Sequence, residues 1–114
     1  MKSKISIWIT FIFLQGWALY AAADLSQLNV YPNPVRTYLG QAVVTFDNVT
    51  PNTRIRIYNV LGSLVWQFET QTAGNSLTWD LKNNTGLDIA SGVYVYLVTN
   101  PDGGKRFGKI AIIR

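Results

Sequence analysis

The side chains best suited to acid–base chemistry in this 114-residue chain are its six carboxylates, because the sequence contains neither histidine nor cysteine. Hydrolysis by a carboxylate pair, as in glycosidases, needs two of them within about 5–9 Å of each other. Most of the six lie in segments with the composition of turns, and their spacing gives no sign that any two converge. They are Asp24, Asp47, Glu69, Asp80, Asp88 and Asp102. We therefore expect a protein that is not an enzyme.

The same composition limits the metals that the chain could bind. Without histidine and cysteine, the usual zinc ligands are missing. The loop that contains Asp80, Asn83, Asn84 and Asp88 offers oxygen atoms. It has too few carboxylates, and no known loop spacing, for a calcium ion that takes about six to eight oxygen ligands. We expect an asparagine-rich turn there, and neither a cofactor nor a small-molecule substrate.

The first 23 residues have the pattern of a secretory signal peptide. Lys2 and Lys4 precede an apolar run, Ile5–Leu14, and three alanines follow at 21–23. A basic start, an apolar run and small residues before a cleavage site are typical of such leaders. The run is shorter than the roughly 20 residues of a membrane-spanning helix, although an uncleaved anchor is the alternative. We expect cleavage after Ala23, export through Sec to the periplasm, and then a cell-surface or extracellular location.

Cleavage would leave a single domain, residues 24–114. This part has eight basic and six acidic residues, a net charge of +2, because Lys2 and Lys4 leave with the leader. The basic residues are scattered and form no dense patch interleaved with aromatic residues, so we expect no nucleic-acid partner. A domain of this size buries about two thirds of its unfolded surface, which is enough for one core. That core must be stable without disulfides.

Apolar residues recur with a period of two along the mature chain. Ile55 and Ile57, for example, alternate with Arg54 and Arg56. Such alternation predicts half-buried antiparallel strands, and clusters of glycine, asparagine and proline between the runs indicate turns. The expected strands lie near 25–31, 41–47, 53–59, 63–69, 76–81, 92–99 and 105–113. Seven short strands separated by regular turns predict an all-β fold, an immunoglobulin-like antiparallel β-sandwich.

The segment YPNPV, residues 31–35, interrupts this pattern. Pro32 and Pro34 fix their φ angles and remove two backbone donors. Asn33 precedes a proline and is therefore confined to extended geometry. Since the segment cannot continue a ladder of hydrogen bonds, we expect a rigid corner through which the chain crosses from one sheet to the other.

The last ten residues, KRFGKIAIIR, combine basic residues with alternating isoleucines. We expect a final strand that ends at Arg114 and has a basic lead-in, Lys105 and Arg106, followed by Lys109. One interpretation of these charges is a solvated edge that discourages aggregation between sheets.

In their order and spacing, YPNPV, GVYVYLV (92–98) and GKIAIIR (108–114) resemble the type A C-terminal sorting domain of type IX secretion in Bacteroidota and relatives. The stretch WDLKNNTGLDIASGVYVY also resembles the immunoglobulin-like domain of the flagellar hook-capping protein. The resemblance covers about Leu28 to Arg114, nearly all of the mature chain.

This resemblance implies a β-sandwich that acts as an address. An outer-membrane translocon recognises such domains, and a sortase-like peptidase often removes them and joins the cargo to a surface glycolipid. Carried onto this chain, the marked features of the family fall on Pro32, Asn33, Pro34, Gly92, Tyr94 and Lys109, with the end at Arg114. The basic lead-in adds Lys105 and Arg106 to this candidate recognition set.

Two other functions are compatible with the sequence. Only Asp24 to Gln27 lie between the expected leader and the resembling segment, so the sequence offers no cargo to sort. The alternatives are a decoy or partner of the secretion machinery, a remnant of a longer gene, and a stand-alone secreted module. Such a module could be a surface adhesion or carbohydrate-binding domain if its tyrosines shared one face; these are Tyr38, Tyr58, Tyr94 and Tyr96. It could also be a structural subunit that self-assembles through edge strands.

Overall fold

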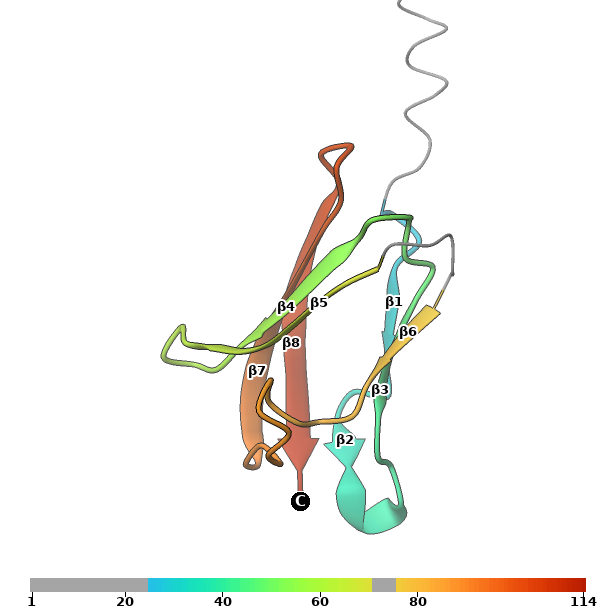
Figure 1. Ribbon diagram of the computed structural model, residues 1–114. Helices are drawn as coiled ribbons and strands as arrows, with labels where there is room; N and C mark the ends of the chain where they lie inside the picture. Colours follow the sequence, from blue (N-terminus) through green and yellow to red (C-terminus); the bar gives the residue numbers. More distant parts are fainter. Residues whose placement is uncertain (1–24, 71–75) are drawn as a thin grey trace, which may run out of the picture.

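A computed structural model of the chain describes residues 25–70 and 76–114 (Figure 1). The expected signal peptide lies outside these ranges. Within them the chain forms eight strands and one short 3-10 helix: β1 (Asn29–Tyr31), β2 (Val35–Arg36), η1 (Thr37–Leu39), β3 (Val44–Asp47), β4 (Arg54–Tyr58), β5 (Leu64–Glu69), β6 (Ser76–Trp79), β7 (Gly92–Thr99) and β8 (Lys105–Ile113). No helix in the described ranges has the length and apolar character needed to cross a membrane.

The strands form two sheets that face each other as the layers of a sandwich (Figure 1). The smaller sheet has the order β1-β3-β6, and the larger has the order β2-β8-β7-β4-β5. All neighbouring strands are antiparallel except β2 and β8, which are parallel. The predicted β-sandwich is confirmed, with this one parallel pair as a departure.

Burial follows the predicted alternation. In β4, Ile55 and Ile57 are fully buried, whereas Arg54 is exposed. The inner faces of both sheets supply the core in this way. Its members include Val35, Val44, Phe46, Trp79, Val98, Ile110 and Ile112.

Trp79, at the end of β6, lies at the centre of an aromatic cluster between the sheets. Its ring stacks on Trp66 of β5 with centroids 5.7 Å apart, and Tyr94 of β7 meets it edge-on at 6.5 Å. The buried indole N–H donates a hydrogen bond of 2.8 Å to the carbonyl of Lys82. The cluster therefore satisfies the one polar atom of its largest member, as buried tryptophans generally require.

Tyr96 crosses from β7 to the smaller sheet over a glycine. It lies opposite Gly108 of β8, and its ring meets Phe46 of β3 edge-on with centroids 5.7 Å apart. A Cβ atom at position 108 would lie 2.5 Å from the Tyr96 hydroxyl and 2.6 Å from Cζ. Gly108 thus provides the space in which the ring bridges the two sheets.

The seven expected strands are all present, but several are shorter than predicted. β1 begins at Asn29 because residues 25–28 form a turn closed by a hydrogen bond from Leu28 N–H to the Leu25 carbonyl, 3.1 Å long. β6 ends at Trp79, and Leu81 has a φ of +63°, which takes the chain out of the extended conformation. The eighth strand, β2, has two residues and was not predicted.

Replacing Gly108 by alanine should destabilise the sandwich by about 1–3 kcal/mol, the usual cost of overpacking a core. The added methyl group would meet the Tyr96 ring, which Phe46 holds from the other side. Urea unfolding of purified residues 24–114 measures the change. In a Tyr96→Ser background the same substitution should cost little, so equal costs in the two backgrounds would contradict this account.

Candidate recognition site

The structure gathers the nine candidate recognition residues around β8. Three of them belong to this strand (Lys105, Arg106 and Lys109), and Arg114 follows it directly. Gly92 and Tyr94 lie on the neighbouring strand β7, opposite Ile112 and Ile110. Pro32, Asn33 and Pro34 form the corner between β1 and β2 on the other side of β8.

Asn33 joins this corner to β8 through both ends of its side-chain amide. The amide nitrogen donates to the Lys109 carbonyl at 2.7 Å, and the amide oxygen accepts from the Ala111 N–H at 3.1 Å. The side chain therefore takes the place that a peptide group of an adjacent strand would take. Directly afterwards β2 pairs with the end of β8, Val35 opposite Ile112. The peptide bonds before Pro32 and Pro34 are both cis.

This arrangement confirms the predicted corner and corrects the interpretation of the last strand. β1 belongs to the smaller sheet and β2 to the larger one, so the chain does change sheets between them. The interpretation of the last strand as a solvated edge is wrong for its second half, because Asn33 and β2 cover it. Along Lys105–Gly108, no strand of the described chain pairs with the outer edge.

Tyr94 is a structural residue of the core. Its side chain is 7% exposed and packs on Trp79. Its hydroxyl donates a hydrogen bond of 2.7 Å to the carbonyl of Ala90, four residues upstream. This is the geometry of the tyrosine corner found in immunoglobulin-like sandwiches. A partner could not contact this ring while the domain is folded.

The two arginines of the candidate set also bind the chain itself. Arg106 donates to the carbonyls of Leu25 and Ser26 at 3.0 and 3.2 Å, which joins β8 to the turn before β1. Arg114 donates through Nε to the Ile89 carbonyl at 2.6 Å, and its backbone N–H donates to Ser91 Oγ at 2.9 Å. These contacts attach the C-terminal residue to the loop between β6 and β7.

Lys105 and Lys109 are the charged candidate residues whose side chains make no polar contact within the described chain. Both are exposed, and no salt bridge joins either side chain to another described residue. They lie two positions on either side of Phe107, so all three project from the same face of β8. This face is the outer surface of the larger sheet, since Ile110 and Ile112 of the alternate set are buried.

The loop between β6 and β7 is the expected asparagine-rich turn. The Asn83 side-chain oxygen accepts hydrogen bonds from the Thr85 N–H, the Thr85 hydroxyl and the Leu87 N–H. The Asn84 side-chain amide forms two hydrogen bonds with the backbone of Gln67 on the edge strand β5. It accepts from the Gln67 N–H at 3.1 Å and donates to the Gln67 carbonyl at 3.3 Å. This role of Asn84 could not be predicted from the sequence, because nothing local relates Asn84 to β5.

The tyrosines do not form one sugar-binding platform. Tyr94 and Tyr96 lie on the inner face of β7 and pack on Trp79 and Phe46. Tyr58 follows the buried Ile57 and lies on the opposite, outer face. Tyr38 lies in η1 and is 64% exposed. The carbohydrate-binding hypothesis requires these four tyrosines to share one face, and they do not.

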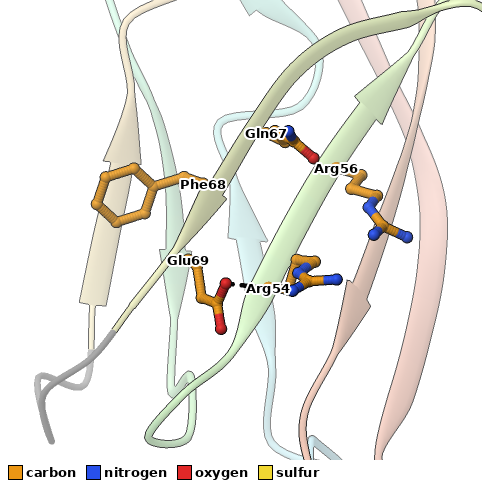
Figure 2. Close-up of a pocket in the computed structure, with 5 residues that line it drawn as sticks. All are labelled: Arg54, Arg56, Gln67, Phe68 and Glu69. Carbon is orange, nitrogen blue, oxygen red and sulfur yellow. Dashed lines mark hydrogen bonds and ion pairs between the residues drawn. The ribbon is translucent and has the colours of Figure 1, made fainter.

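A shallow hollow on the outer face of β4 and β5 is lined by Arg54, Arg56, Gln67, Phe68 and Glu69 (Figure 2). Arg54 donates to the Glu69 carboxylate at 3.2 Å, and Figure 2 shows Phe68 pointing away from the four polar side chains. Glu69 is the one carboxylate in this lining. Among the residues that the structure describes, no three acidic side chains lie together as a metal site would need.

Comparison with known families identifies this architecture. Residues 29–113 match the model of the secretion system C-terminal sorting domain. The chain belongs to this family. The match includes the corner at Asn33, all of β7 and all of β8, so it contains eight of the nine candidate recognition residues.

Two solved structures from Porphyromonas gingivalis are similar to this sorting domain. PorZ, described as an essential bacterial surface component of the type-IX secretion system, matches with a TM-score of 0.68 and 28% identity, over 82% of this chain and 12% of that chain. Latent dimeric PorU matches with a TM-score of 0.56 and 26% identity, over 75% of this chain and 9% of that chain. The sorting domain thus corresponds to a small part of either protein. The comparison with curated proteins gave no match.

Replacing Asn33 by alanine should destabilise the sorting domain by about 1–3 kcal/mol, because two hydrogen bonds to β8 are lost. Urea unfolding measures this cost. The matched control is Asn29→Ala, since Asn29 is an exposed asparagine of β1 whose side chain forms no hydrogen bond with the described residues. Equal effects of the two substitutions would contradict the role assigned to Asn33.

The ion pair between Lys82 and Asp88 should make stability depend on pH. Lys82 Nζ donates to the Asp88 carboxylate at 2.8 Å. This hydrogen bond and the lysine charge lower the pKa of Asp88, and the same bond raises the pKa of Lys82. A carboxyl with a lowered pKa stabilises the fold above its unfolded pKa and loses that effect as the pH falls through the lowered value. The lysine contributes below its unfolded pKa, and its effect is lost as the pH rises through the raised value.

Substitution Asp88→Asn should therefore lower the melting temperature slightly at neutral pH, and the difference from the parent should vanish in acid. Melting curves between about pH 7 and about pH 2 test this. A difference that stays constant across this range would show that the pair does not act through its charges.

Proposed function

We propose that this sorting domain is a non-enzymatic address, which the outer-membrane translocon of type IX secretion recognises for export and cell-surface attachment. The observation that carries the proposal is the family match over residues 29–113. The similarity to PorZ, itself described as a surface component of this secretion system, supports it. As the family resemblance implies, a sortase-like peptidase would then remove the domain.

The geometry favours recognition of a folded surface over recognition of a linear tail. Asn33, Tyr94, Arg106 and Arg114 use their side chains to hold β8 and its surroundings in place. These residues would thus act by shaping the domain, and a partner would contact what the folded domain exposes.

Four of the five described carboxylates, all but Asp102, support a role without catalysis. Glu69 and Asp88 each pair with a cation at 3.2 and 2.8 Å. Asp80 accepts a hydrogen bond from the Lys82 N–H, and Asp47 accepts one from the Asn48 N–H. Each of these groups is therefore engaged in local structure.

Fusion of residues 24–114 behind a periplasmic reporter, in a host with type IX secretion, tests the address function. The parent fusion should appear on the cell surface. Removal of Lys105–Arg114 would be uninformative, since it deletes a strand that pairs on both sides. A better comparison makes the same valine-to-aspartate substitution at two sites. Val98→Asp changes a buried side chain that is 0% exposed, and Val60→Asp changes one that is 74% exposed.

The Val98→Asp fusion should remain inside the cell, because burial of an unpaired carboxylate unfolds the domain, whereas the Val60→Asp fusion should reach the surface. Total reporter is measured in each strain to separate sorting from degradation. Retention of the parent fusion, while a known sorting domain exports the same reporter, would refute the address function. Export of an unfolded Val98→Asp fusion would refute recognition of the folded domain.

A further inference from the structure

The two outer faces of the sandwich differ in chemistry. On the smaller sheet, the residues that alternate with the buried ones are mostly polar; they include Asn29, Thr45, Asp47, Ser76 and Thr78. This composition is that of an ordinary solvated face. The larger sheet differs in composition, and no described element covers its outer face.

The outer face of the larger sheet carries a group of apolar side chains. Cross-strand partners share a face, so the register places Phe107 of β8 beside Leu97 of β7, and Lys109 beside Val95. Phe107 is 74% exposed. Within the described chain, β8 has no partner strand on its other side at this point, so the phenyl ring lies near the edge of the face. An exposed phenyl ring with aliphatic neighbours in the next strand is costly to leave in water and is typical of an interaction site.

Three cations lie next to Phe107 and Leu97. Lys105 and Lys109 flank Phe107 on β8, and Arg56 of β4 lies opposite Leu97. No salt bridge within the described chain neutralises any of the three. The acidic residue of the same face, Glu69, is engaged by Arg54. The face therefore presents Phe107 and Leu97 beside a positively charged rim formed by Arg56, Lys105 and Lys109. The apolar surface continues past Lys109 through Val95 and Val93.

We propose that this surface, the basic face of the larger sheet, docks on an acidic protein surface of the secretion machinery. The inference rests on the proposed address function and deepens it by naming the contact. An apolar centre with a polar rim is the usual anatomy of a protein interface, and opposite charges on the partner would steer and orient the complex. Phe107 is the most exposed apolar side chain of this face, and such a ring suits a pocket on a protein, where aromatic anchors supply much of the affinity. One phenyl ring offers a bilayer less apolar surface than a single acyl chain, which by itself gives only marginal membrane binding.

Two variants of the surface-delivered fusion test the proposal. The first, Arg56→Gln with Lys109→Gln, removes two rim charges and leaves the Lys109 carbonyl free to bind Asn33. The second, Phe107→Thr, removes the anchor with a residue suited to strands. The three changed side chains lie on the outer face of the sheet and outside the core, so the melting temperature of each variant should stay close to that of the parent. Each variant should lower the ratio of surface to periplasmic reporter by about tenfold or more, the effect of losing an interface hot spot.

Matched controls change the same properties elsewhere. Gln27→Glu with Thr78→Glu lowers the net charge by the same amount at two exposed positions away from the basic face. Leu61→Thr removes an apolar side chain that is 87% exposed in the turn between β4 and β5. Both controls should be delivered to the surface like the parent.

The outcomes separate this inference from the function on which it rests. Retention of the parent fusion contradicts the address function itself. If the parent is delivered and the folded basic-face variants are delivered equally well, the docking surface is refuted and the address function stands. An equal loss of delivery in the control variants would also refute the docking surface alone. Sedimentation of the purified parent domain with vesicles of phosphatidylethanolamine and phosphatidylglycerol, abolished by Phe107→Thr, would assign the face to a membrane and also overturn the proposal.

Discussion

The docking of β8 is the interaction on which the rest of the structure depends. This strand pairs with β7 from Lys105 to Ile112 on one side. On the other side, Asn33 and β2 complete the ladder over its second half. The contact joins residues that are more than 70 positions apart in the sequence, so the first and last segments of the described domain hold each other in place. The inner face of β8 then supplies Ile110 and Ile112 to the core.

The family's marked residues can be understood through this constraint. Asn33 replaces a peptide group beside β8, Tyr94 closes the corner that leads into β7, and Arg114 attaches the chain's end to the preceding loop. Their side chains face the domain itself. The lysines of β8 face solvent instead, around Phe107. The motif residues therefore fall into two groups. One group stabilises the sandwich, and the other lies exposed on its outer face.

Much of this fold could be predicted from the sequence because the forces are local. Alternation in β4 located its buried isoleucines, and two prolines around Asn33 identified the corner between the sheets. Alternation could not orient β7, where Tyr94, Tyr96 and Val98 on one face are as apolar as Val93, Val95 and Leu97 on the other. Only packing against Trp79 and Phe46 decides that the tyrosines point inward. The partners of Asn33 and Asn84 were likewise hidden, since each amide bonds to a strand distant in sequence.

The central claim is that β8 is an integral strand of the folded domain, held from both sides. Native-state amide hydrogen exchange on purified residues 24–114 tests it most directly. The amides of Ile110, Ala111 and Ile112 should exchange as slowly as the most protected amides of β7, through global unfolding alone. Exchange of these three amides by local opening, at a rate typical of the edge strand β5, would show that the C-terminal strand detaches independently and would contradict the account.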